Sequence, residues 1–299
     1  MNKLMYSAPL YFVAFLPMII MLYQLCPQKF RKFVLLLANY AFFFIWSKFF
    51  LVYQVITMLI TYVSAKVIAH TANKKTKKIS LFIAIVINLG VLVVLKYTNF
   101  FGENIFAIFH QPFTPVRLIA PIGISYYTLQ MISYLMDTSS GKIHSNHSIV
   151  DFAVYASFFP TLIQGPITRF NEIKDSIHAG NPITYQNLKF GSQRILFGLM
   201  KKMIIADRLD PAVSKIFTSY TQDGLFSLIG AVLCTIQLYM DFSGIVDICL
   251  GSAEIFGIKL PENFRQPFFA ENASDFWRRW HITLGTFLRD YVFYPISLA

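Results

Sequence analysis

Long runs of apolar residues, separated by short basic or polar stretches, dominate the chain. The first run, Tyr6–Leu25, carries no charge over its 20 residues, which is enough for a helix to cross ~30 Å of hydrocarbon. Further runs lie at 33–46, 49–69, 79–95, 119–136, 190–205 and 224–250. Only Ser47 and Lys48 separate the second run from the third, so these two predict a hairpin. We therefore predict an all-α polytopic membrane protein that forms one multi-pass domain over residues 1–299.

Three stretches break this pattern. Residues 96–117 are aromatic but contain Gly102, Pro112 and Pro115, which predicts an interfacial segment. Residues 152–164 are too few to cross untilted and end in Gln164-Gly165-Pro166, which predicts a re-entrant or tilted element whose end faces the protein interior. Residues 169–187 form the longest polar connector.

Composition and charge support a membrane protein. Hydrophobic residues make up 56% of the chain and charged residues 14%, against ~25% charged in soluble proteins. The net charge of +11 comes largely from lysines between apolar runs, so the positive-inside rule explains it better than nucleic acid does. That rule predicts that 26–32 and 70–78 are cytoplasmic. The three cysteines are scattered and indicate neither a disulfide framework nor a metal site.

Three polar side chains interrupt the apolar run at 224–250: Gln237, Asp241 and Asp247. Such groups are costly in a bilayer unless they are paired or beside water. Gln237 and Asp241 lie one helical turn apart. We expect them to be buried, either bonded to Arg265 or Arg278 or taking part directly in chemistry.

Histidine and charged residues are mixed with aromatic ones in the stretch from Asn263 to Pro295. We expect a helix that starts at Asp275 with Ser274 as its N-cap, and an ion pair between Asp275 and Arg279. This helix would place His281 on one apolar stripe with Trp277, Leu284 and Leu288. Desolvation there would keep the imidazole neutral and able to act as a base. The alternative is an interfacial amphipathic helix in which His281 has no chemical role.

Several catalytic motifs are absent from the sequence. It has no G-x-S-x-G, P-loop or dinucleotide motif, so serine-hydrolase and nucleotide-driven mechanisms lack their minimum parts. His147 and Asp151 match an H-x-x-x-D acyltransferase pattern. Because a polar loop meets an apolar run there, we interpret Asp151 as an acid in the first turn of a helix.

Eight blocks, in the same order along the whole chain, resemble the membrane-bound O-acyltransferase (MBOAT) family in its bacterial polysaccharide O-acetyltransferase branch, which includes alginate O-acetylases. The blocks include PIGISYYTLQMISYLMD at 121–137, ASFFPTLIQGPITR at 156–169, IQLYMDFSGIVDICLG at 236–251, LPENFRQPFFA at 260–270 and FWRRWHITLGTFLRDYVFYP at 276–295. The resemblance implies a helical bundle around a central tunnel, with re-entrant and interfacial helices. In it an acyl group from a cytoplasmic thioester meets a hydroxyl acceptor on the opposite face of a bacterial inner membrane.

The resemblance also implies roles. His281 matches the first of two family active-site residues, with Asp241, Gln237, Gln164, Arg278 and Trp280 as supporting or orienting candidates. The second family histidine lies further downstream, and no histidine follows His281 here, so we expect an N-terminal portion that lacks the last helices and is inactive alone. Acetyl-CoA or another acyl thioester is the implied donor, with no bound cofactor or metal.

The implied partners are a polysaccharide acceptor, periplasmic or membrane-anchored acetyl-transfer proteins, and the lipid bilayer. Two functions from other classes stay open on the residues alone. One is a transporter or flippase for a carrier-linked sugar, although the Gly165-Pro166 break has no counterpart of the kind that related transporter halves show. The other is an accessory membrane subunit without catalysis.

Overall fold

The computed structural model describes residues 8–118, 120–121, 123–143, 147–219 and 224–297. The first residues of the predicted Tyr6–Leu25 helix, the start of the run at 119–136 and residues 144–146 lie outside these ranges. The chain divides into two compact units. Unit 1 comprises Met1–Val34, Gln164–Thr168 and Ser176–Ala299, and unit 2 comprises Leu35–Ile163 and Arg169–Asp175. Within the described ranges both units are helical, and the one β-type pairing is an isolated bridge.

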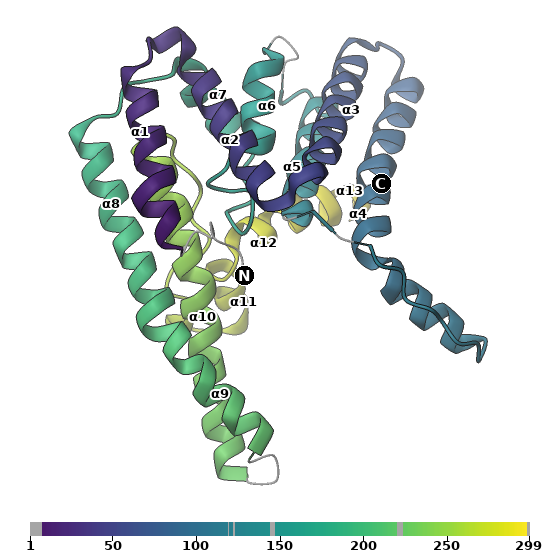
Figure 1. Ribbon diagram of the computed structural model, residues 1–299. Helices are drawn as coiled ribbons and strands as arrows, with labels where there is room; N and C mark the ends of the chain where they lie inside the picture. The colour runs from purple at the N-terminus through teal and green to yellow at the C-terminus, as the bar shows by residue number, and fades with distance from the viewer. Residues whose placement is uncertain (1–7, 119, 122, 144–146, 220–223, 298–299) are drawn as a thin grey trace. The chain divides into compact units, whose positions relative to one another are not determined.

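Unit 2 contains most of α2 (Arg31–Ser47), followed by α3 (Leu51–His70), α4 (Lys74–Ile108), α5 (Ile124–Ser139), α6 (Ile149–Ser157) and the start of α7 (Phe170–Ala179). Helices α3, α4 and α5 pack side by side (Figure 1). Buried amides hold this core together. The Asn39 side chain donates to the carbonyl of Val154 and accepts from the backbone N–H of Phe159, at 3.2 and 2.9 Å. These two bonds fix the point at which the backbone leaves α6.

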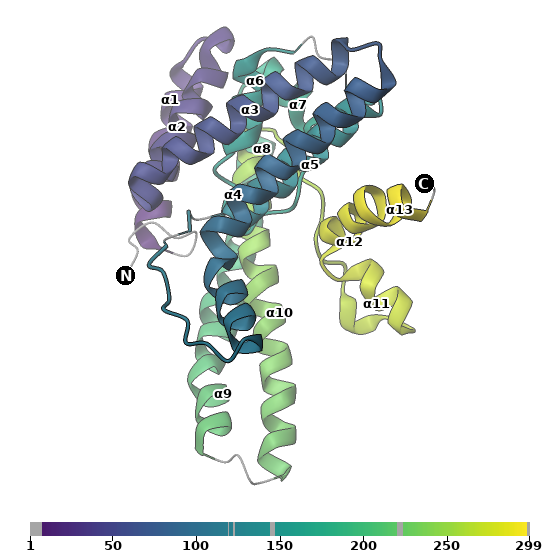
Figure 2. The ribbon, with the colours of Figure 1, turned by 90° about the vertical axis from the view of Figure 1, so that its right-hand side faces the viewer.

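Unit 1 contains a π-helical turn (Tyr11–Phe15) that continues into α1 (Leu16–Leu25), then α8 (Tyr185–Leu199), a second π-helical segment η4 (Met200–Ala206), α9 (Asp207–Ser219) and α10 (Gly224–Ile255). The short helices α11 (Ala273–Arg279), α12 (Ile282–Leu288) and α13 (Tyr294–Ser297) follow. Helix α10 runs along α8 and then α9, in green at the lower part of Figure 2.

Three of the described helices, α3, α4 and α10, are long and apolar enough to cross a membrane, and the helical stretch Tyr11–Leu25 is a shorter apolar one. The predicted all-α membrane protein is confirmed. The element predicted at 152–164 differs in its bounds, because α6 begins at Ile149 and ends at Ser157, well before Gly165-Pro166. Its N-cap is Ser148, whose hydroxyl accepts from Val150, and Asp151 lies in its first turn as expected.

Three expectations about element boundaries are wrong. The basic stretch at 70–78 was expected to be a loop, but its residues 74–78 are the first part of α4, which begins after the Asn73 N-cap. The same helix continues through the expected interfacial segment as far as Ile108, because Gly102 sits against the ring of Phe113 rather than breaking the helix. The polar connector at 169–187 contains α7 and the start of α8, whose Thr184 and Asn187 form a capping box.

Candidate active site

Helices α8 and α10 approach each other closely through glycines. A Cβ atom at Gly191 would lie 2.6 Å from the carbonyl oxygen of Gly251, and one at Gly198 would lie 2.5 Å from that of Gly244. The two glycines of α8, Gly191 and Gly198, are seven residues apart, and so are the two of α10, Gly244 and Gly251. Each pair therefore falls on one face of its helix. Small residues at this spacing allow backbones to pack at short range in a membrane, where no hydrophobic force drives helices together. The contact brings the polar side chains of the two helices within reach of each other.

A chain of ion pairs follows this contact. Asp247 on α10 accepts from Arg194 Nε at 2.6 Å and from Lys201 Nζ at 2.7 Å. Arg194 also binds Glu262 through both terminal nitrogens, at 3.0 and 2.7 Å. The Asp247 side chain is only 6% exposed, so its charge depends on these two partners. The network ties α8 and α10 to the segment that follows α10.

A cavity of about 430 Å³ opens beside this network. The four charged residues of the network line it, together with apolar and polar residues of α8, α10 and the segment after α10. The lining residues are Arg194, Phe197, Lys201, Tyr239, Met240, Ser243, Val246, Asp247, Glu262, Phe264, Arg265 and Gln266. Aromatic and aliphatic walls with a few charged groups at one side suit a ligand that has both an apolar and a polar part.

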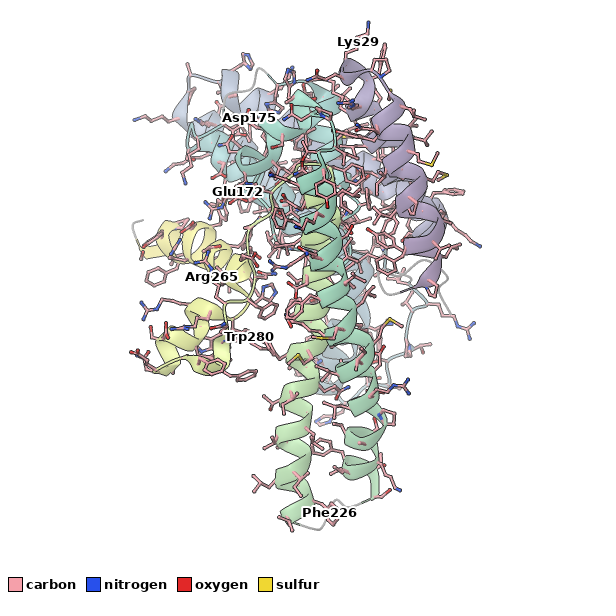
Figure 3. The ribbon with its side chains drawn as sticks, turned by 90° about the vertical axis from the view of Figure 1, so that its left-hand side faces the viewer. Lys29, Glu172, Asp175, Phe226, Arg265 and Trp280 are labelled. Atoms are coloured by element: carbon pink, nitrogen blue, oxygen red, sulfur yellow. The ribbon has the colours of Figure 1, made fainter. Side chains whose placement is uncertain are left out.

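His281 lies where the backbone reverses between α11 and α12. Phe264 and Trp280 form an antiparallel bridge, and the N–H of Arg265 donates to the carbonyl of Arg279 at 3.0 Å. Helix α11 therefore stops, and His281 takes a left-handed conformation with φ 45° and ψ 52°. Figure 3 shows Arg265 and Trp280 on this segment beside α10.

The environment of the His281 imidazole makes it a neutral base. Its ring packs edge to face on Phe242 of α10, with centroids 4.9 Å apart. Burial lowers the pKa of His281 to about 4. Its Nδ1 atom is buried without a hydrogen-bond partner among the described residues. A neutral imidazole has one acceptor nitrogen, so at physiological pH this ring can accept a proton from an alcohol.

Comparison with known proteins shows the family to which this chain belongs. The model of the membrane-bound O-acyltransferase family matches residues 138–299, which include α10 and His281. The chain belongs to the MBOAT family. The chain is 35% identical to the probable alginate O-acetylase AlgI of Pseudomonas aeruginosa over 99% of its length. It is also 34% identical to the peptidoglycan O-acetyltransferase of Helicobacter pylori over 98% of its length.

A more distant match is the teichoic acid D-alanyltransferase of Bacillus subtilis, which is 33% identical over 62% of the chain. The chain spans 57% of the length of the Pseudomonas relative and 62% of that of the Helicobacter relative. The MBOAT resemblance expected from the sequence blocks is thereby confirmed.

The structure changes the expected surroundings of His281. The predicted continuous helix from Asp275 is wrong, since α11 ends at Arg279 and a new helix begins at Ile282. The N-cap of α11 is Asn272 rather than Ser274, and its side chain accepts from the N–H of Asp275. The apolar stripe is also lost, with Trp277 65% and Leu288 49% exposed. The Asp275–Arg279 ion pair is confirmed at 2.8 Å, and it lowers the pKa of the Asp275 carboxyl.

The polar residues of α10 have partners other than those expected. Asp241 pairs with Lys202 rather than Arg265 or Arg278, and Gln237 donates to Asp210 at 2.8 Å. Both are half-buried rather than fully buried. The reason is the π-helical segment η4 and the helix after it, which run along α10 and present their own polar groups to it. Asp247 is buried, and it is paired as a charge in an apolar run requires.

The remaining supporting candidates differ in position. Trp280 stacks on Phe276, with centroids 5.6 Å apart, and meets the ring of Phe264 at 5.1 Å. It therefore stabilises the reversal that carries His281. Arg278 is exposed on α11, and Gln164 is half-buried at the start of the 164–168 segment.

Sequence reasoning missed several functional candidates: Arg194, Lys201, Glu262, Asn263 and Thr283. Asp247 gave one usable signal, because a carboxylate in an apolar run needs a cation, and Arg194, Lys201 and Lys202 are the cations of the run at 190–205. Asn263 and Thr283 gave no signal of their own, because their partners lie far away in sequence.

Proposed function

We propose that the protein of which this chain is part is an O-acyltransferase. It moves an acetyl or related acyl group from a cytoplasmic thioester, such as acetyl-CoA, across the membrane to hydroxyls of an exported polysaccharide. The observation that carries the proposal is the neutral, half-buried imidazole of His281 within the region that matches the MBOAT family. Two of the relatives are O-acetyl-transferring enzymes by name.

The proposed chemistry needs a base because an alcohol is a poor nucleophile. His281 accepts the proton of the acceptor hydroxyl as its oxygen attacks the thioester carbonyl. The bond from carbonyl carbon to sulfur then breaks, an ester forms, and the proton held on the imidazole leaves with the thiolate. Assistance of this kind is worth roughly 10²–10⁴-fold in rate.

The proposed location is a bacterial inner membrane, crossed several times. Support comes from the spanning helices and from the basic residues at 29–32 and 74–78, which the positive-inside rule assigns to the cytoplasm. A cytoplasmic donor and an exported acceptor would need such a protein between them. Periplasmic or membrane-anchored proteins that pass the acyl group on are the expected partners.

The proposal is tested by reconstituting the whole gene product in liposomes with a radiolabelled acetyl thioester and a polysaccharide. Alginate and peptidoglycan fragments are the first acceptors to compare, following the relatives. We expect label on the glycan from the wild-type protein, loss of at least 100-fold in His281→Gln, and little change in His70→Gln. His70 is a matched control, because it is exposed at the end of α3 and bonds only its own helix. Full transfer by His281→Gln would refute the role of His281.

A further inference from the structure

Asn263 makes three hydrogen bonds to the two residues that follow His281. Its backbone carbonyl accepts from the N–H of Ile282 at 3.0 Å. Its side-chain oxygen accepts from the N–H of Thr283 at 3.0 Å and from the Thr283 hydroxyl at 2.7 Å. Asn263 is fully buried, so water does not compete for these bonds.

Thr283 extends the connection to a third segment. Its hydroxyl donates to Asn263 and accepts from the backbone N–H of Ile167 at 3.0 Å. Ile167 directly follows Gly165-Pro166, where the chain has left α6. One buried hydroxyl thus joins the segments 164–168, 260–266 and 281–285, all of which belong to unit 1.

These bonds replace the cap that α12 otherwise lacks. His281 occupies the N-cap position of α12 but makes no side-chain cap bond. The first four N–H groups of a helix need outside partners. Asn263 supplies them for Ile282 and Thr283, and the His281 carbonyl accepts from Leu284 and Gly285, both at 3.1 Å.

A residue other than glycine uncommonly adopts the left-handed conformation, and it persists there only where its surroundings hold it. Here the following two residues are fixed by Asn263, and the preceding residues are fixed by the Phe264–Trp280 bridge. This conformation directs the His281 ring onto Phe242 rather than along a continuous α11–α12 helix. The hydrogen bonds at Asn263 and Thr283 therefore bear directly on where the imidazole lies.

We propose that Asn263 and Thr283 are positioning residues that hold His281 in its left-handed conformation with the imidazole sequestered against Phe242. Neither residue contacts the reacting atoms. The inference rests on the proposed function for its catalytic meaning, but its structural content can be tested without any transfer assay.

The test compares Thr283→Val with Thr283→Ser. Valine has the shape of threonine without the hydroxyl, so it loses the hydroxyl's bonds to the Asn263 side-chain oxygen and to the Ile167 N–H, whereas serine keeps both. The bond from the backbone N–H of residue 283 to Asn263 stays in both variants. The readout is the pH profile of diethylpyrocarbonate modification at His281 in the purified whole protein, followed by peptide mass spectrometry. The reagent attacks neutral imidazole, so the midpoint of the profile gives the pKa, and exposed His70 serves as the internal reference.

We expect a midpoint near 4 in the wild-type protein, as burial of the ring dictates, and the same midpoint in Thr283→Ser. In Thr283→Val the midpoint should rise by more than one pH unit toward the ordinary value of 6.5, because the released ring gains water. A folded Thr283→Val protein with the wild-type midpoint would overturn the proposal. If the valine variant does not fold, Thr283→Ala removes the hydroxyl without adding a second methyl group. A raised midpoint at His281 in this variant would then support the proposal, and the wild-type midpoint would overturn it.

Transfer kinetics provide a second readout that separates the two proposals. If both are right, Thr283→Val lowers kcat at least tenfold with a smaller effect on KM for the acceptor, and Thr283→Ser restores most of kcat. If no acyl transfer occurs in any form of the protein, the proposed function fails while the labelling result still decides the positioning role. A normal kcat in a Thr283→Val protein with a shifted midpoint would refute the catalytic meaning of the positioning.

Discussion

Replacing Asp247 by asparagine removes the charge that holds α8 and α10 together at their closest approach. The variant keeps nearly the same shape but leaves Arg194 and Lys201 without their shared carboxylate. Arg194 keeps its bidentate ion pair with Glu262, and its side chain is 38% exposed, so water can hydrate the guanidinium in part. Lys201 is only 13% exposed, and its other contacts are the rings of Phe197 and Tyr239.

The loss of these partners sets the expected decrease in the free energy of unfolding. Removing one partner of a buried ion pair costs ~3–5 kcal/mol, because the other charge is left buried and uncompensated. Among the described residues Asp247 is the one carboxylate that Lys201 binds, whereas Arg194 keeps Glu262. We therefore expect the lower end, roughly 3 kcal/mol. Asp241→Asn should cost less than about 1 kcal/mol, since Asp241 is 36% exposed and its partner Lys202 keeps Asp207 at 2.7 Å.

The assay is unfolding of the purified protein by sodium dodecyl sulfate in mixed micelles, followed by tryptophan fluorescence and circular dichroism. Glu103→Gln is the control, because it makes the same change in charge at an exposed position and should stay within ~0.5 kcal/mol of the wild type. The double variant Asp247→Asn/Lys201→Met removes both charges and should recover more than half of the loss. An Asp247→Asn variant no less stable than Asp241→Asn would refute this reasoning.

Three further predictions concern packing, topology and pH. Gly198→Ala should lower stability by about 1–2 kcal/mol in the same assay, because its Cβ would meet the Gly244 carbonyl, whereas Gly90→Ala, with nothing within 4 Å, should raise it by ~0.5–1 kcal/mol. A cysteine at position 75 should react with an impermeant maleimide only in permeabilised cells, and efficient labelling of intact cells would contradict the topology. The pKa of His281 is lower in the folded protein, about 4, than its ordinary value of 6.5, so the unfolded state binds more protons in that window and stability should fall as pH drops from 6.5 to 4. The loss should be about 1–2 kcal/mol because the ring is partly exposed, and His281→Gln should flatten the dependence.

Much of the fold could be predicted from the sequence because a bilayer imposes strong rules on composition. Uncharged runs of about 20 residues must form helices there, since only helices satisfy their own backbone groups in hydrocarbon. The same rule makes Asp247 conspicuous and implies a cationic partner. The Asp275–Arg279 pair depends on local helical spacing alone, so it too was predictable.

The conformation around His281 was decided by tertiary contacts. Local spacing favours one helix from Asp275 to Leu288, and no residue at 280–281 is a helix breaker in sequence. The break arises because Phe264 pairs with Trp280 and Asn263 binds the backbone at 282–283, across roughly 20 residues of chain. Similarly, the carboxylates of α10 pair with Lys201 and Lys202 because glycines let α8 and the η4 segment after it approach α10.

The sequence by itself therefore determined the helical membrane class, the family and the candidate base, since these depend on composition, local periodicity and ordered motifs. Only the tertiary structure decided which cation neutralises each carboxylate and how the His281 ring is held. Those outcomes depend on hydrogen bonds and close packing between segments far apart in the chain, which outweigh the modest helix propensities of the residues between them.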